Sequence, residues 1–162
     1  MEAEIRKNRD ILYHSARGLI LLGLWDMLKN AAFIWLDPWV ITALNMQTEM
    51  PLDVPVYLQK IVVIIICVIL YMIGFLYRLF IGLNAVGESK GRKKGKFYLI
   101  MTALFILIKM YSTGREVFIR TTEQELFLTS FLLDTTTIFA AVQIIYRAVR
   151  LRKLTGKRKP ET

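Results

Sequence analysis

The stretch IVVIIICVILYMIGFLY, residues 61–77, decides the fold class, because it carries no charge between Lys60 and Arg78 and is almost entirely apolar. A hydrocarbon core about 30 Å thick needs roughly 20 helical residues to cross it. Hydrophobic residues make up 55% of the 162-residue chain, which is too apolar for an ordinary soluble domain of this length. The sequence therefore predicts an all-α integral membrane protein.

Four apolar stretches are long enough to form membrane-spanning helices. They are residues 18–36, 58–83, 97–113 and 126–146, and a basic tail follows over 147–162. The third stretch is short, and we expect Lys96 and Lys109 to extend toward opposite membrane surfaces. Since no linker separates these stretches, the sequence predicts a single membrane domain over residues 1–162, built as a four-helix transmembrane bundle.

Lys and Arg residues are distributed unevenly between the two ends of these spans. Four lie before the first span, five between the second and third spans, and seven after the last. All of these fall on one side of the membrane if the spans alternate, and only four, Lys60, Lys109, Arg115 and Arg120, lie toward the other side. Because positively charged loops stay in the cytoplasm, both termini are predicted to be cytoplasmic, and we expect a plasma (bacterial inner) membrane.

Basic residues beside the membrane predict contact with anionic lipid headgroups, worth about 1 kcal/mol per residue. The residues are Lys90, Arg92, Lys93, Lys94, Arg150, Arg152 and Lys153. A nucleotide-binding loop is not expected in this region, because Glu88 stands where that motif needs a lysine. Docking of the tail to an acidic partner or to ribosomal RNA is the alternative. No aromatic residue follows Tyr146 to stack on bases, so nucleic acid is not the expected partner.

The first and fourth spans each carry a polar stripe. On the first span the stripe consists of Gly23, Asp26, Lys29 and Asn30. On the fourth span it consists of Ser130, Asp134, Thr137 and Ala141. A charge facing lipid at mid-depth costs at least about 2.5–3.5 kcal/mol, so both stripes should face protein or water. Lys29 and Asp134 fall at nearly equal depth, and we predict that Lys29 is shared between Asp26 and Asp134.

Two interpretations of this charged cluster compete. It could be a buried ion network that fixes which helices pack together or which partner subunit docks. Alternatively, Asp26 and Asp134 could be the titrating groups of a small transporter, since three ionised groups would hold a net charge of −1 and favour protonation of one carboxyl.

The second span contains a further stripe at helical spacing. Its members are Cys67, Tyr71, Gly74, Arg78 and Gly82. We expect the two glycines to allow close helix packing, with Arg78 extending to the inner headgroups. The alternative is a cation in a vestibule open to the cytoplasm, where it would attract an anionic ligand or lipid.

Catalytic motifs are absent from the sequence. His14 is the only histidine and Cys67 the only cysteine, so neither a metal site nor a cofactor is expected, and the chain is not predicted to be an enzyme. We expect a non-catalytic scaffold, assembly or regulatory subunit that binds anionic lipid and either a second copy or another membrane protein. The alternatives are a small oligomeric proton- or ion-coupled transporter and, third, a membrane enzyme that depends on the same carboxylates.

Overall fold

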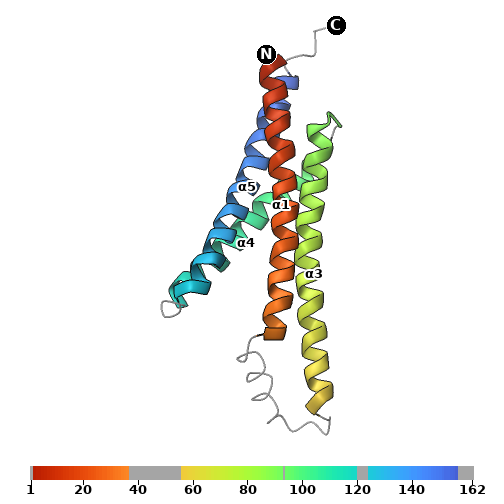
Figure 1. Ribbon diagram of the computed structural model, residues 1–162. Coiled ribbons are helices and arrows are strands. Elements are labelled where there is room, and N and C mark those ends of the chain that lie inside the picture. The colour runs from red at the N-terminus through yellow and green to blue at the C-terminus, as the bar shows by residue number, and fades with distance from the viewer. Residues whose placement is uncertain (1, 37–55, 93, 120–123, 157–162) are drawn as a thin grey trace. The chain divides into compact units, whose positions relative to one another are not determined.

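The computed structural model describes residues 2–36, 56–92, 94–119 and 124–156, which form helices and no strand (Figure 1). The helices are α1 (Glu2–Leu36), α3 (Val56–Ser89), α4 (Phe97–Ile119) and α5 (Gln124–Gly156). Within these described residues, three segments are long and apolar enough to cross a membrane, namely Ile64–Ser89, Phe97–Arg115 and Ser130–Gly156. The all-helical prediction is confirmed. Membrane crossing by the first predicted span, residues 18–36, stays a prediction.

All four described helices are longer than the spans that the sequence predicts. α1 begins at Glu2, α3 continues to Ser89, α4 to Ile119, and α5 to Gly156. The early start of α1 has a physical cause, since Ile5, Leu12 and Ala16 recur at helical spacing and are all buried. The first ten residues of the predicted basic tail likewise continue α5, because Ala148 and Leu151 pack inside the protein.

Contacts divide the chain into two compact units. Unit 1 combines Met1–Leu22 with Arg78–Thr162, and unit 2 comprises Gly23–Tyr77. Unit 1 therefore contains the first part of α1, the last part of α3, and α4 and α5. That residues 1–162 act as one membrane domain stays a prediction.

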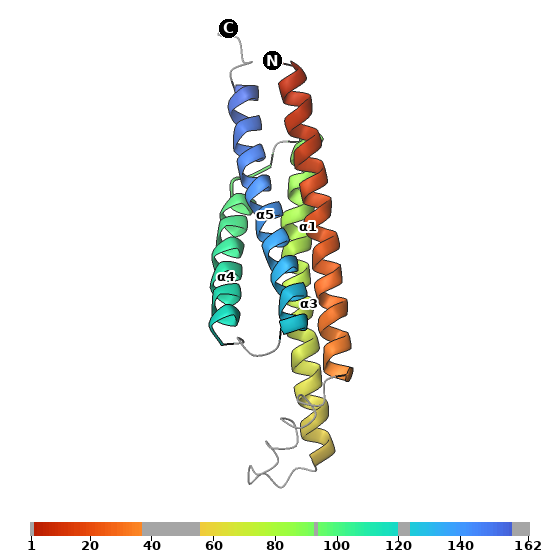
Figure 2. The ribbon, with the colours of Figure 1, turned by 60° about the vertical axis from the view of Figure 1, so that its left-hand side comes forward.

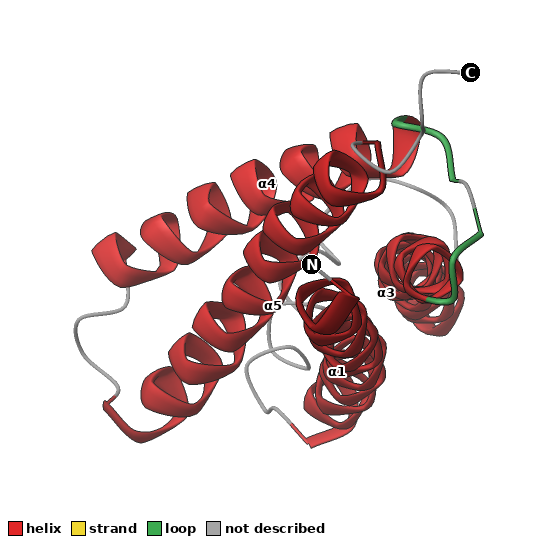
Figure 3. Cartoon of the chain, turned by 90° about the horizontal axis from the view of Figure 1, so that it is seen from above, coloured by secondary structure: helices red, strands yellow, loops and turns green. Residues whose placement is uncertain are grey.

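Within unit 1, helices that follow one another in sequence run antiparallel. Gly82 of α3 lies against Ile20 of α1, and the Arg78 side chain of α3 bonds the Leu22 carbonyl of α1. Residue numbers thus decrease along α3 in the direction in which they increase along α1. α4 and α5 lie side by side (Figures 2 and 3). These contacts give unit 1 the alternating direction expected of an up-and-down bundle.

Apolar and small side chains form the core of unit 1 at spacings of mostly three and four residues. The buried apolar residues are Ile5, Leu12, Ala16 and Leu19 on α1, Ile81 and Ala85 on α3, Tyr98 and Phe105 on α4, and Ala141, Ile144, Ala148 and Leu151 on α5. Close approach is clearest at Gly82, where an added Cβ would lie 2.7 Å from Ile20 Cδ1. Small residues at these positions allow the helices to pack tightly.

A glycine ends α3 and sets up the turn to α4. Gly91 has a φ of +84°, the Gly91 amide bonds the Glu88 carbonyl at 2.9 Å, and the Arg92 amide bonds the Gly87 carbonyl at 3.1 Å. This is the Schellman arrangement, in which a left-handed residue satisfies the last helical carbonyls. The end of α3 is thus capped by the turn at Gly91, and Gly87 lies within the helix.

In unit 2, α3 presents apolar side chains on its surface. Ile65, Ile66, Ile69, Leu70 and Ile73 are each at least half exposed. Exposed apolar side chains in such numbers are typical of a helix surrounded by lipid or by other membrane helices.

Candidate functional site

Asp134 on α5 forms an ion pair inside unit 1. Lys109 Nζ of α4 donates to Asp134 Oδ1 at 2.6 Å, and the Thr113 hydroxyl donates to Asp134 Oδ2 at 3.2 Å. Lys109 and Thr113 are four residues apart, so they share the face of α4 that meets α5. Asp134 is 8% exposed. Each carboxylate oxygen therefore has a donor, as a buried charge requires.

Lys109 was not among the expected partners of Asp134, for which the sequence predicts Lys29. The predicted third span ends at residue 113, which places Lys109 near a membrane surface. α4 continues to Ile119, ten residues beyond Lys109, and Asp134 lies ten residues after the start of α5. The end of α4 and the start of α5 follow one another in the chain, and Lys109 and Asp134 each lie ten residues from that connection. This equal count would have predicted that the two side chains lie at the same depth.

Thr137 lies one turn after Asp134 and is 3% exposed, with its hydroxyl donating to the Leu133 carbonyl at 2.7 Å. Asp26, Lys29 and Asn30, the other members of the predicted cluster, are half-buried and belong to unit 2. Asp26 and Lys29 both have interactions. Because Asp134 belongs to unit 1, the predicted sharing of Lys29 between Asp26 and Asp134 stays a prediction.

A second buried acid, Glu88, joins three segments of unit 1. Arg152 of α5 donates to both carboxylate oxygens, at 2.6 and 2.7 Å, and the Tyr98 hydroxyl of α4 donates to Oε2. The same guanidinium bonds the Lys94 and Gly95 carbonyls at 3.0 and 3.2 Å. Two parallel bonds between a guanidinium and a carboxylate fix both distance and orientation. Glu88 thus holds the end of α3, the turn and the start of α4 against α5.

The beginning of α1 is bonded to the last part of α5. Arg147 Nη1 donates to Asn8 Oδ1 at 3.0 Å, and Asn8 is 1% exposed. One turn further on, Arg150 donates to Glu4 Oε1 and to the Tyr146 hydroxyl. Both side chains of the Arg150 and Glu4 pair are about 40% exposed, so this pair is a surface contact that stabilises weakly.

Arg78, instead of extending to the inner headgroups, is buried. It is 6% exposed, its Nη1 donates to the Leu22 carbonyl at 3.5 Å, and its guanidinium lies 5.5 Å from the centre of the Phe105 ring. Phe105 therefore provides a cation–π contact inside unit 1. This position also gives no support to a cation in an open vestibule.

The other members of the second-span stripe differ in how deeply they are buried. Gly82 is buried against Ile20, as expected for a packing glycine. In unit 2, Cys67 is half-buried, Tyr71 is exposed, and the position of a Cβ on Gly74 is open. Helix packing at these three positions stays a prediction.

The predicted headgroup contacts also divide into two groups. Lys90, Arg92, Arg150 and Lys153 are exposed, whereas Lys94 and Arg152 are half-buried, and Lys93 lies outside the described residues. Arg152 is occupied by Glu88, and Arg150 is bonded to Glu4. Among the exposed four, Arg150 and Lys153 line the apolar groove that α4 and α5 form.

Within the described residues, no group of three or more His, Cys, Asp or Glu side chains gathers to hold a metal ion. No protein-family model, curated protein or solved structure matches the chain.

Proposed function

We propose that this chain is a non-catalytic scaffold or assembly subunit of the plasma (inner) membrane, with four spans and both termini in the cytoplasm. It would hold other membrane helices and anionic lipid. The observation that carries the proposal is that Asp134 is satisfied by Lys109 and Thr113 within its own unit. A carboxylate bonded in this way is typical of an ion pair that fixes helix packing.

The topology is supported by which helix ends are bonded together. Arg150 at the end of α5 bonds Glu4 at the start of α1, and Arg152 bonds Glu88 at the end of α3. These are the three regions in which Lys and Arg are concentrated. Their association at one end of unit 1 agrees with the positive-inside prediction that all three lie in the cytoplasm.

The partner-binding role is supported by the apolar surface of α3 in unit 2. A membrane subunit that binds other helices needs such a surface, because packing between helices drives association within lipid. A second copy of the chain or another membrane protein could cover it.

Purification from its native membrane in a mild detergent at low salt, with mass spectrometry of everything that travels with the chain, tests this proposal. We expect a membrane protein in a fixed ratio to the chain. The matched control is the Asp134→Asn/Lys109→Met variant, which removes both charges and should keep the partner if the pair only fixes helix packing. Recovery of the chain as a monomer, with neither a second copy nor another protein, would contradict the scaffold role.

A small oligomeric proton- or ion-coupled transporter is the second candidate, since Lys109 and Asp134 place a base and an acid together in apolar surroundings. Reconstitution in liposomes with a pH-sensitive dye distinguishes the two functions. A transporter gives proton flux that Asp134→Asn abolishes and Glu4→Gln leaves unchanged. A scaffold gives no flux in any of the three proteins.

A further inference from the structure

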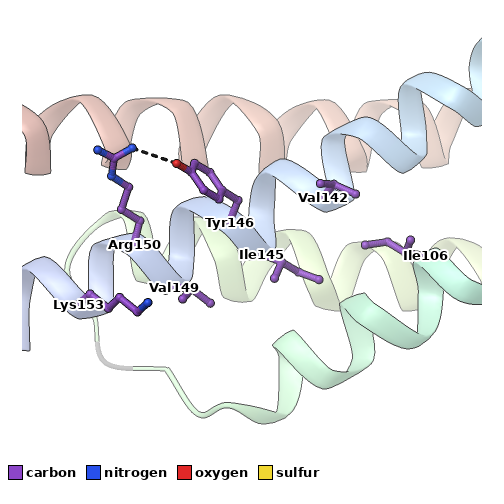
Figure 4. Close-up of a pocket in the computed structure, with 7 residues that line it drawn as sticks. All are labelled: Ile106, Val142, Ile145, Tyr146, Val149, Arg150 and Lys153. Carbon is purple, nitrogen blue, oxygen red and sulfur yellow. Dashed lines mark hydrogen bonds between the residues drawn. The ribbon is translucent and has the colours of Figure 1, made fainter.

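An apolar groove with a basic end lies between α4 and α5 in unit 1. Its volume is about 540 Å³, and its lining residues are Ile106, Val142, Ile145, Tyr146, Val149, Arg150 and Lys153 (Figure 4). Arg150 and Lys153 lie at one end of this row, and Val142 and Ile106 lie at the other. The groove therefore changes from apolar to basic along α5.

A second hollow of about 430 Å³ adjoins the basic end. It is lined by Arg150, Arg152, Lys153, Leu154 and Gly156, so the two hollows share Arg150 and Lys153. Glu4 and Glu88 pair with Arg150 and Arg152, respectively. Three cations and two acids leave an excess of one positive charge, which belongs to Lys153. An occupant of both hollows must have an apolar part and an adjoining anionic part.

We propose that these two hollows bind one anionic phospholipid of the inner leaflet, with an acyl chain along the groove and the phosphate at Lys153. This inference rests on the proposed membrane location and names the lipid partner. The depth fits, because Lys153 lies seven residues, or about 10 Å, past the predicted end of the span at residue 146. The headgroup region adds about 5–7 Å on each side of the hydrocarbon core, and the lysine stem can reach back to it.

Tyr146 lines the groove one turn before Arg150. Arg150 Nη1 donates to the Tyr146 hydroxyl oxygen at 3.0 Å, which directs the hydroxyl proton away from the guanidinium (Figure 4). From Val142 to Tyr146, the end of the predicted span, the helix rises about 6 Å, so the groove accommodates the part of an acyl chain that lies next to the headgroup.

Native mass spectrometry of the detergent-solubilised chain tests the site, with phosphatidylglycerol and phosphatidylcholine titrated separately. We expect the wild type to prefer phosphatidylglycerol. Lys153→Ala should weaken phosphatidylglycerol binding about fivefold, which corresponds to ~1 kcal/mol, and should leave phosphatidylcholine binding unchanged. Lys90→Ala is the matched control, because Lys90 is exposed and lies outside both hollows. Equal losses in the two variants would mean that diffuse surface charge attracts the lipid, and would overturn the site.

A second pair of variants tests the apolar part. Val142→Trp fills the groove without changing charge and should weaken phosphatidylglycerol binding at least fivefold. Phe139→Trp introduces the same side chain at a position of α5 that is 63% exposed and does not line the groove, so it should have no effect. Unchanged binding in Val142→Trp would overturn the acyl-chain position. If the wild type does not prefer phosphatidylglycerol but retains a protein partner, only this lipid site is contradicted. If it prefers phosphatidylglycerol but has no protein partner, only the scaffold role is contradicted.

Discussion

Replacement of Lys109 by methionine tests how strongly the ion pair with Asp134 stabilises the bundle. The two charged atoms are 2.6 Å apart, and the side chains are 17% and 12% exposed. At an effective dielectric constant of about 20, this separation gives an attraction of roughly 6 kcal/mol. Desolvation of both ions offsets most of this attraction. Removal of one partner nevertheless leaves the other charge buried, which costs about 3–5 kcal/mol.

A double-mutant cycle isolates this interaction from the other effects of each substitution. We expect Lys109→Met and Asp134→Leu each to lower the free energy of unfolding by about 3 kcal/mol. The double variant buries no charge, so it should be destabilised by less than the sum of the two single variants, with a coupling of about 2–3 kcal/mol. Equilibrium unfolding by SDS in mixed micelles, followed by circular dichroism, measures all three values.

Two further variants serve as controls for this cycle. Lys90→Met removes an exposed lysine and should change stability by less than about 0.5 kcal/mol. The charge reversal Lys109→Asp/Asp134→Lys should recover part of the stability lost in Lys109→Met. Additive costs in the cycle, to within about 0.5 kcal/mol, would refute the conclusion that the two side chains interact.

Three further substitutions test the packing of unit 1, and a fourth, at Gly74 in unit 2, is a control. Glu88→Gln should lower the free energy of unfolding by about 2–3 kcal/mol, as measured by thermal unfolding in detergent. This cost is lower than the cost of breaking a fully buried ion pair, because Arg152 is 28% exposed and can be rehydrated. Gly82→Val should cost about 1–3 kcal/mol by overpacking against Ile20, whereas Gly74→Val, at an open position, should cost less than 1 kcal/mol in the same assay. Gly91→Val should cost roughly 1–2 kcal/mol, because a β-branched residue is strained at a φ of +84°, and an unchanged melting temperature would show that the Schellman turn contributes little.

The hydropathy of the sequence predicts three of the helices well, but it does not predict where they end. The long apolar run around Ile65 leaves little choice of structure, so the membrane-crossing length of α3 follows directly. The helix that starts at Glu2 is different, because its first 16 residues are highly charged and only the spacing of Ile5, Leu12 and Ala16 indicates a buried face. Helical periodicity was the signal for this segment, and hydropathy alone could not detect it.

Only part of the candidate site could be predicted from the sequence. Asp134 stands out in the sequence because an acid within an apolar span must be satisfied. Its partner Lys109 could not be identified from the polar stripes of two spans, since it lies on a third helix. Glu88 is more difficult still, because its role depends on the Gly91 turn and on the continuation of α5 to Arg152, and both are set by packing beyond the apolar spans.

The pairing of Asp134 with Lys109 also changes the charge balance on which the transport interpretation depends. With Asp26, Lys29 and Asp134 alone, the predicted cluster has a net charge of −1, which favours protonation of one carboxyl. Lys109 adds the missing positive charge, so Asp134 and Lys109 are neutral together in unit 1, as Asp26 and Lys29 are in unit 2. The formal charges of these four residues therefore sum to zero. This balance weakens the charge argument for the proposed transporter, and the Asp134 and Lys109 pair is consistent with the proposed scaffold role.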